Sequence, residues 1–311
     1  MNLTGSDAVV TGGAGFVGSH LAEYALDRGA TVTVVDDFSN GEREWVPEDA
    51  TLVEGDLTDP SVAESAIGEE TDIVFHFAAE KDVNAPAPRD QFEDNTAMTL
   101  NVLERMDEVD VDSIAYTSSS TVYGEAPRPT PEDYPQQPIS MYGTSKTAEE
   151  GLISTFVHTA DMRAWVFRFA NIVGPRLKPG AVIVDFIQKL ADSPETLEIL
   201  GDGRQEKSYM HVEGCVDAMG HVVENATKPF NVYNLGTRTT TSVDRIAEIV
   251  SEKMGLDPAF EYTGGDRGWP GDVPRMRLSI EKLAGLGWEP DESSDDAVER
   301  ATDALLEQYS E

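Results

Sequence analysis

The stretch "TGGAGFVGSH" (residues 11–20) places Gly12, Gly15 and Gly18 at three-residue intervals. The run before it, "DAVVTGG" (7–13), predicts a strand and a turn, and residues 16–28 predict a helix that ends at Gly29. Glycine permits a tight turn and lets backbone N–H groups approach a phosphate at a helix N-terminus, where the helix dipole favours an anion. This order of strand, turn and helix indicates a dinucleotide-binding unit.

An acid at the end of the next predicted strand, "TVTVVDD" (31–37), supports this interpretation. Asp36 follows Gly18 by 18 residues. A carboxylate at this point binds both hydroxyls of an adenosine ribose and repels a 2′-phosphate. No arginine adjoins Asp36 to accept that phosphate. The sequence therefore favours NAD over NADP, and the alternative is a structural glycine turn beside a solvated acid.

The first half of the chain alternates β-branched runs with helical patterns. Strands are also expected at 51–56, 72–79, 111–120 and 163–171, and helices at 59–68, 90–108 and 143–158. The strands are almost continuously apolar, which is typical of a parallel sheet with helices on both faces. The expected fold class is α/β, a Rossmann-like doubly wound parallel sheet with a smaller C-terminal substrate-binding α/β lobe. We assign 1–174 and 212–257 to an NAD-binding domain, and 175–211 and 258–311 to the lobe.

The charge of the chain is strongly one-sided. Fifty-eight acids against 23 bases give a formal net charge of −35, and the acids are spread along the sequence. Such a surface suits a halophile's cytoplasm, where concentrated salt screens the repulsion. It also argues against nucleic-acid binding, which needs a basic surface. We expect no membrane span, because no apolar run approaches the ~20 residues that one requires.

The remaining signals favour a cytoplasmic protein without a metal. Residues 1–10 lack the cationic and apolar regions of a secretory signal. Cys215 is the single cysteine and is expected to be a small buried hydrophobe. His76 and His211 do not lie at metal-ligand spacing with the other three histidines, so we expect structural roles for both.

The segment "YGTSK" (142–146) places Tyr142 and Lys146 four residues apart, on one face of a predicted helix. A free tyrosine has a pKa of about 10, which is too high for a general base at neutral pH. A neighbouring ammonium favours the phenolate. Ser119, in the hydroxyl-rich strand end "TSSSTVYG" (117–124), would share the hydrogen bond to the reacting oxygen. The alternative for a tyrosine and a lysine at this spacing is an ordinary surface pair.

Together these motifs resemble the extended short-chain dehydrogenase/reductase family, and within it the UDP-glucose 4-epimerase-like nucleotide-sugar enzymes. The resemblance runs almost from end to end. Its further segments are "DDFSNG" (36–41), "GDLTD" (55–59), "HFAA" (76–79), Asn95, "RFANIVGPR" (168–176), "GDGRQEKSYMHV" (201–212), "NLGT" (234–237) and "GDVP" (271–274).

The resemblance implies three sets of site residues. The catalytic set is Ser119, Tyr142 and Lys146. The NAD-binding set is Gly12, Gly15, Phe16, Val17, Gly18, Asp36, Asp37, Asn40, Gly41, Asp56, Leu57, Phe77, Ala78, Ala79, Lys81, Asn95, Thr117, Ser118, Tyr142, Lys146, Phe169 and Ala170. The substrate-binding set is Ser119, Tyr142, Asn171, Val182, Lys207, Tyr209, Arg267 and Asp272.

Two positions depart from the family pattern. The family usually has arginine where this chain has Lys207 and Trp269, and those arginines clamp the substrate diphosphate. Lysine keeps the charge but loses the bidentate geometry. Arg267 lies two residues before Trp269, and we hypothesise that Arg267 and Lys207 together form the clamp.

The resemblance implies an NAD-dependent 4-epimerase of the UDP-glucose/UDP-galactose type, which works through a transient 4-keto sugar and returns hydride to its opposite face. Of the alternatives in the family, 4,6-dehydratases carry an Asp-Glu pair where this chain has Ser120 and Thr121, and UDP-glucuronate decarboxylases usually carry a Glu at the second of these positions. A non-catalytic NAD-binding regulatory or scaffold protein is the alternative of another class, although such proteins tend to lose the Tyr/Lys pair.

The partner and the sugar are less determined. The helices at 90–108 and 143–158 are expected to form a homodimer, as their equivalents commonly do in the family, or else only to cover the sheet. The sugar stays open between the glucose/galactose, N-acetyl and uronic acid types, because the pocket size depends on side chains such as Val182 and Met276. UDP is favoured as the nucleotide by resemblance alone.

Overall fold

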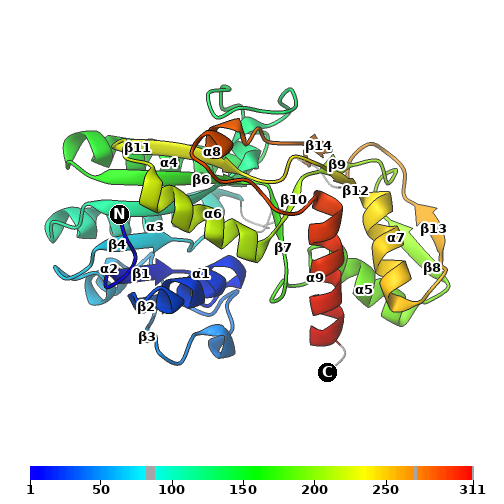
Figure 1. Ribbon diagram of the computed structural model, residues 1–311, viewed down its shortest axis with the longest axis horizontal. Helices are drawn as coiled ribbons and strands as arrows, with labels where there is room; N and C mark the ends of the chain where they lie inside the picture. Colours follow the sequence, from blue (N-terminus) through cyan, green and yellow to red (C-terminus); the bar gives the residue numbers. More distant parts are fainter. Residues whose placement is uncertain (82–87, 269–271, 310–311) are drawn as a thin grey trace. The chain divides into compact units, whose positions relative to one another are not determined.

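The computed structural model describes residues 1–81, 88–268 and 272–309 (Figure 1). The chain divides into two compact units. The first unit comprises Met1–Tyr123, Gln136–Arg168 and Val216–Tyr233, and the second comprises Gly124–Pro135, Phe169–Cys215 and Asn234–Glu311. None of the helices in the described ranges has the length and apolar character of a membrane span.

A seven-stranded sheet forms the centre of the first unit, in the order β11-β6-β5-β4-β1-β2-β3. Its strands are β1 (Asp7–Thr11), β2 (Thr31–Asp36), β3 (Thr51–Glu54), β4 (Ile73–His76), β5 (Ser113–Ser119), β6 (Arg163–Phe169) and β11 (Phe230–Leu235). β1 pairs in parallel with β2 and β4, and the pairs β2·β3 and β4·β5 are also parallel. The strand order reverses between β1 and β4, which is where such sheets bind their ligands.

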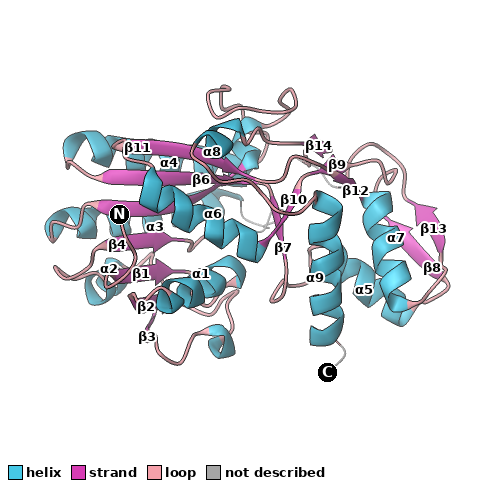
Figure 2. Cartoon of the chain, in the orientation of Figure 1, coloured by secondary structure: helices cyan, strands magenta, loops and turns pink. Residues whose placement is uncertain are grey.

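Helices cover both faces of this sheet. They are α1 (Phe16–Asp27), α2 (Pro60–Ala66), α3 (Pro88–Glu108), α4 (Met141–Thr159) and α6 (Val212–Asn225), with 3₁₀ turns η1 (Arg43–Trp45) and η2 (Ser120–Tyr123). In Figure 2, α1 and α6 lie in front of the sheet and α2, α3 and α4 lie behind it. All four residues of β4 are buried, which explains why the strand is apolar up to its last residue, His76. The expected Rossmann-like doubly wound sheet is confirmed.

The second unit combines short strands with helices. Its elements are β7 (Asn171–Val173), α5 (Val182–Asp192), β8 (Thr196–Ile199), β9 (Glu206–Lys207), β10 (Tyr209–His211), β12 (Thr241–Ser242), α7 (Val243–Met254), β13 (Ala259–Tyr262), β14 (Arg275–Met276), α8 (Glu281–Gly285) and α9 (Ser294–Gln308). The strands form three small sheets, β10-β7, β12-β9-β14 and β13-β8. α7 packs against both α5 and α9.

One predicted strand differs from the structure. The run expected at 163–171 is divided at Ala170 into β6 and β7. The backbone N–H of Ala170 donates to the carbonyl of Leu235, whereas the next N–H, of Asn171, donates to that of Ser208. The chain therefore changes its strand partner within one residue. A pattern of apolar residues cannot reveal this change, because both segments are extended.

Candidate active site

The glycine turn after β1 is packed backbone against backbone. Gly12 has a φ of +64°, and a Cβ there would lie 2.7 Å from the backbone nitrogen of Ala78. A Cβ on Gly18 would lie 2.2 Å from the carbonyl oxygen of Gly12. Gly15 is the N-cap of α1 and offers no side chain to the first N–H groups of that helix. These N–H groups therefore suit an anion.

Asp36 lies directly beside this turn. Its carboxylate is buried and accepts backbone hydrogen bonds from Ala14 at 2.9 Å and from Phe38 at 2.9 Å. Both bonds hold Asp36 at the end of β2, close to the start of α1. The carboxylate and the phosphate-binding turn thus belong to one rigid corner, as a dinucleotide requires. The residues present fit NAD.

Asn95, predicted to line the dinucleotide, joins three elements. It is buried on α3, where its amide group accepts from the backbone N–H of Glu80 at 2.7 Å and donates to the Glu80 carbonyl at 2.9 Å. The same amide donates to Ser145 Oγ on α4 at 3.2 Å. Asn95 therefore fixes the chain that leaves β4. Lys81 lies on that chain, at the edge of the described residues, and is exposed.

Tyr142 and Lys146 occupy the first turns of α4, which begins after the N-cap Ser140. Lys146 is only 1% exposed. Its Nζ lies 5.7 Å from the centre of the Tyr142 ring and 4.8 Å from that of the Tyr116 ring. The ammonium pairs with Glu149 Oε2 at 3.4 Å. The tyrosine and the lysine that the sequence predicted as a pair do lie close together. The structure shows in addition that the carboxylate of Glu149 lies beside the lysine.

The pKa of the Tyr142 phenol is raised above its ordinary value. Burial is the main cause, the ammonium of Lys146 acts in the opposite direction, and the carboxylate of Glu149 raises the pKa further. The phenol therefore holds its proton at neutral pH in this state. A second positive charge beside the ring would favour the phenolate.

Ser119 ends β5, and its Oγ accepts hydrogen bonds from the backbone N–H of Thr121 at 3.2 Å and from Thr121 Oγ1 at 2.9 Å. Its own proton remains available to donate. The start of α4 lies against this turn, since a Cβ on Gly143 would be 2.8 Å from the Thr121 carbonyl oxygen. The preceding hydroxyl, of Ser118, is directed elsewhere and donates to Glu150 at 2.5 Å.

Sequence reasoning missed Glu149 and Glu150. Glu150 is buried and accepts two hydrogen bonds from Arg168, at 2.9 and 2.7 Å, and one from Gln136 at 2.6 Å. This network joins α4 to β6 and is structural. The signal that could have revealed both acids is their position three and four residues after Lys146, which places them beside it on the same helix.

Two predicted substrate-binding residues lie side by side in the second unit. β7 and β10 pair in parallel with Asn171 opposite Tyr209. Asn171 Nδ2 is buried and has no hydrogen-bond partner among the described residues. Burial, together with the charge of Asp272, raises the pKa of the Tyr209 phenol. An unused amide donor beside a neutral phenol suits an anionic or polyhydroxyl ligand.

The cations proposed for the diphosphate already have partners. Lys207 Nζ lies 2.6 Å from Asp272 Oδ1, and the second carboxylate oxygen of Asp272 accepts from the backbone of Gly268 at 3.1 Å. Arg267 donates to the Asp272 carbonyl at 2.7 Å and forms an ion pair with Glu125. Lys207, Arg267 and Asp272 therefore form one cluster. Val182 begins α5, whereas Trp269 lies outside the described residues.

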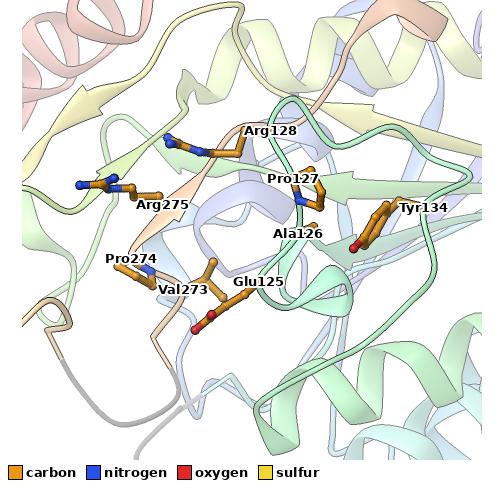
Figure 3. Close-up of a pocket in the computed structure, with 8 residues that line it drawn as sticks. All are labelled: Glu125, Ala126, Pro127, Arg128, Tyr134, Val273, Pro274 and Arg275. Atoms are coloured by element: carbon orange, nitrogen blue, oxygen red, sulfur yellow. The ribbon is translucent and has the colours of Figure 1, made fainter.

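A cavity of about 460 Å³ lies in the same unit. It is lined by Glu125, Ala126, Pro127, Arg128, Tyr134, Val273, Pro274 and Arg275 (Figure 3). Arg128 and Arg275 extend toward the same side of the view in Figure 3, and Arg128 pairs with Glu206 at 3.2 Å. Glu125 lines this cavity and is also the ion-pair partner of Arg267.

The fold agrees with comparisons to known proteins. The model of the NAD dependent epimerase/dehydratase family matches residues 8–236. The chain belongs to this family. It is 30% identical over 301 residues to the UDP-glucose 4-epimerase of Corynebacterium glutamicum, covering 91% of this chain and 90% of that one.

Solved structures agree with this assignment to the NAD dependent epimerase/dehydratase family. A crystal structure of UDP-galactose 4-epimerase is 39% identical, with a TM-score of 0.89 over 97% of this chain and 99% of that one. The UDP-glucose 4-epimerase of Thermus thermophilus, solved with NAD, is 30% identical with a TM-score of 0.86, over 96% and 98% of the two chains. The fold, the family and the NAD cofactor expected from the sequence are confirmed.

Proposed function

We propose that the protein is an NAD-dependent UDP-sugar 4-epimerase of the UDP-glucose/UDP-galactose type. The observation that carries the proposal is the buried Lys146 ammonium beside Tyr142, on a helix packed against the turn of Ser119. Ser120 and Thr121 supply hydroxyls, and no carboxylate, to that turn. The set provides one acid/base group and one further hydrogen-bond donor, which suffices to move one proton.

The dinucleotide would be held by the first unit. The N–H groups at the start of α1 would bind its pyrophosphate, and Asp36 with Asn40 would bind the adenosine ribose. Asp56 and Leu57 border the adenine in this proposal. When bound, NAD supplies the acceptor, and later the donor, of the two electrons exchanged with the sugar carbon.

The proton is moved by Tyr142. Its phenolate accepts the proton of the sugar 4-hydroxyl as the carbonyl forms, and the phenol returns it when the carbonyl is reduced. Lys146 stabilises the phenolate by its charge. Ser119 donates its free proton to the same sugar oxygen and so orients it. Because Tyr142 ends the cycle in the protonation state in which it began, no further acid or base is needed.

The nucleotide part of the substrate would be held by the second unit. Asn171 donates to the phosphates, and Tyr209 and Asp272 contact the nucleoside. Val182, at the start of α5, borders the same substrate. Firm binding of the nucleotide leaves the sugar free to present either face between the two steps, so most of the binding energy arises away from the reacting carbon.

Incubation with UDP-glucose, UDP-N-acetylglucosamine and UDP-glucuronate tests the proposal. The assay uses molar KCl, because a net charge of −35 calls for screening. Proton NMR is expected to show a 4-epimer of at least one of these sugars. A 4-keto-6-deoxy sugar would identify a dehydratase instead, and UDP-xylose a decarboxylase. Absence of any product would favour a non-catalytic NAD-binding protein.

Arg267→Ala is expected to raise the KM for the UDP-sugar about tenfold or more, with a smaller change in kcat. We propose that Arg267 leaves Glu125 to join Lys207 on the substrate diphosphate. A hydrogen bond to a charged group contributes roughly 1.5–3 kcal/mol, and each 1.4 kcal/mol corresponds to about tenfold in affinity. Steady-state kinetics with varied UDP-sugar measures the change.

Two further variants isolate this role of Arg267. Glu125→Gln removes the competing carboxylate and is expected to lower KM. Arg277→Ala removes a partly buried arginine ten residues further along the chain, whose guanidinium donates to the carbonyl of Arg238, and should leave KM unchanged. An unchanged KM in Arg267→Ala would exclude Arg267 from the clamp.

We also infer a homodimer that buries α3 and α4. These helices pack closely on each other in the first unit. Two large apolar side chains are exposed here, Ile139 just before α4 and Met141 at its first residue. A second copy would cover them.

A further inference from the structure

A line of buried polar side chains begins at the residue before the glycine turn. Thr11 Oγ1 accepts backbone hydrogen bonds from Phe77 at 3.1 Å and from Ala78 at 3.2 Å. The same oxygen lies 2.7 Å from His76 Nδ1. Thr11 thus holds together the ends of β1 and β4, where the turn approaches the chain that leaves β4.

The line continues from His76 to the catalytic lysine. His76 Nε2 lies 3.0 Å from Thr99 Oγ1 on α3. Thr99 donates to Glu149 Oε2 at 2.9 Å, and the same oxygen pairs with Lys146 Nζ at 3.4 Å. His76, Thr99 and Glu149 are all fully buried. Four consecutive contacts therefore connect the glycine turn to Lys146.

The hydrogen bonds in this line of side chains run in one direction, from Thr11 through His76 and Thr99 to Glu149. Burial, assisted by the charge of Lys146, lowers the pKa of His76 to about 3, so the ring is neutral and carries one proton. Thr99 has a single proton, and Glu149 accepts it. His76 Nε2–H must therefore donate to Thr99, and Nδ1 accepts from the Thr11 hydroxyl. The opposite direction would require Thr11 Oγ1 to accept three hydrogen bonds.

The hydrogen bond and the ion pair of Glu149 converge on one of its oxygens. Thr99 and Lys146 both contact Oε2, whereas Oε1 has no hydrogen-bond partner in the described part of the chain. Thr99 and Lys146 therefore orient this carboxylate, which also acts on the phenol of Tyr116 and raises its pKa. The cost of burying one charge is also reduced by the presence of the other.

We propose that Glu149 is a positioning residue that acts through Lys146: it fixes the ammonium group and balances its charge beside Tyr142. Thr99 and His76 in turn tie Glu149 to the turn that carries the dinucleotide. This inference rests on the proposed function, because it assumes that Tyr142 moves the proton. The effect of Lys146 on the phenol is then that of an ion pair, which is weaker than that of a lone cation.

Four titratable groups, namely Lys146 and three residues near it, affect the proton of Tyr142 in this arrangement. They are Lys146 and Glu149 on α4, Tyr116 on β5, and His76 on β4, which acts through Thr99. Tyr116 stays neutral because burial and Glu149 raise the pKa of its phenol well above the ordinary value. His76 is neutral as well, so Lys146 and Glu149 are the two charges of the set. Replacing Glu149 therefore leaves a cation whose charge is unbalanced.

Glu149→Gln tests the proposal in the holoenzyme. We expect kcat to fall about tenfold, with KM for the UDP-sugar within twofold of the wild type. The acid limb of the kcat profile should move to lower pH, because Glu149 raises the pKa of Tyr142 and the variant lacks that charge. An acid limb at the wild-type position would overturn the proposal, since a purely structural Glu149 would change stability alone.

A second pair of variants keeps the test open if Glu149→Gln fails to fold. Thr99→Val removes the link between His76 and Glu149. Thr96→Val is its matched control, because Thr96 lies on the same helix and its hydroxyl donates to the Phe92 carbonyl. We expect Thr99→Val to lower kcat by severalfold and Thr96→Val to leave it unchanged. Equal kcat values in the two variants would contradict the proposal.

Nitrogen-15 NMR of the histidines provides a readout that does not depend on turnover. His76 is assigned as the ring whose resonances Thr99→Val shifts and Thr96→Val does not. The wild type should show the Nε2–H tautomer, without protonation between pH 5 and 8. The Nδ1–H tautomer would reverse the direction of the hydrogen bonds of His76 with Thr11 and Thr99, and would overturn the proposal. Wild-type protein that turns over no UDP-sugar would instead refute the proposed function.

Discussion

Tyr142→Phe is expected to lower kcat about 10³-fold while the protein keeps its bound NAD. General acid–base catalysis contributes roughly 10²–10⁴-fold, and Tyr142 is the group that we propose for both proton transfers. The phenyl ring retains the packing of the phenol beside Lys146, so α4 should keep its position. The measurement combines kcat with the NAD content of the denatured protein. A protein that only senses NAD would have no turnover to lose, and its NAD content would be the same in this variant.

The matched control is Tyr24→Phe, which removes a phenol from α1 in the same compact unit. Tyr24 stacks with Arg28, whose guanidinium carbon lies 3.6 Å from the ring centre, and has no part in the proposed chemistry. Its kcat should stay within twofold of the wild type. If Tyr142→Phe retained more than a tenth of wild-type turnover, another group would have to move the proton.

The features that sequence reasoning found are those determined by local order along the chain. Gly12 and Gly18 lie on either side of one turn, and Asp36 ends the next strand, so spacing alone predicted their neighbourhood. Tyr142 and Lys146 share a helix face for the same reason. Four residues correspond to about one helical turn, and this spacing does not depend on how the rest of the chain folds.

The features that it missed depend on contacts between distant residues. Glu149 meets Thr99 across 50 positions, and Lys207 meets Asp272 across 65. No periodicity encodes such a pairing, because charged residues are expected on the surface and both acids and bases are common there. The buried state of Glu149 and Glu150 emerges only when α3, α4 and β6 are packed together.

The hydroxyls of "TSSSTVYG" have different hydrogen-bond partners in the structure. Ser119 keeps a free proton at the expected position, and Thr121 supports it by donating to its oxygen. The hydroxyl of Ser118 donates to the internal Glu150, so the predicted contact of Ser118 with NAD would have to be made by its backbone. Thr117 likewise donates to the His76 carbonyl, at 3.2 Å. Composition indicated a polar strand end, but the acceptor of each hydroxyl depends on the neighbouring elements.

Gly18→Ala is expected to lower the affinity for NAD about 100-fold. The added Cβ would lie 2.2 Å from the Gly12 carbonyl oxygen and 3.0 Å from the Gly13 Cα, so only backbone could give way. Overpacking costs about 1–3 kcal/mol, and 3 kcal/mol corresponds to roughly 100-fold in binding. The start of α1 should therefore move away from the turn, and its N–H groups would no longer meet the pyrophosphate. Calorimetry with NAD on the apoprotein measures the loss.

Gly151→Ala separates this effect from the substitution of any helical glycine. Gly151 lies on α4, and a Cβ there would meet nothing within 4 Å. Alanine in a helix interior is more favourable than glycine by about 0.8–1.0 kcal/mol, so this variant should keep NAD and melt at the same or a higher temperature. Wild-type NAD affinity in Gly18→Ala would show that α1 tolerates displacement. The close approach of Gly18 to Gly12 would then be a packing feature without a part in cofactor binding.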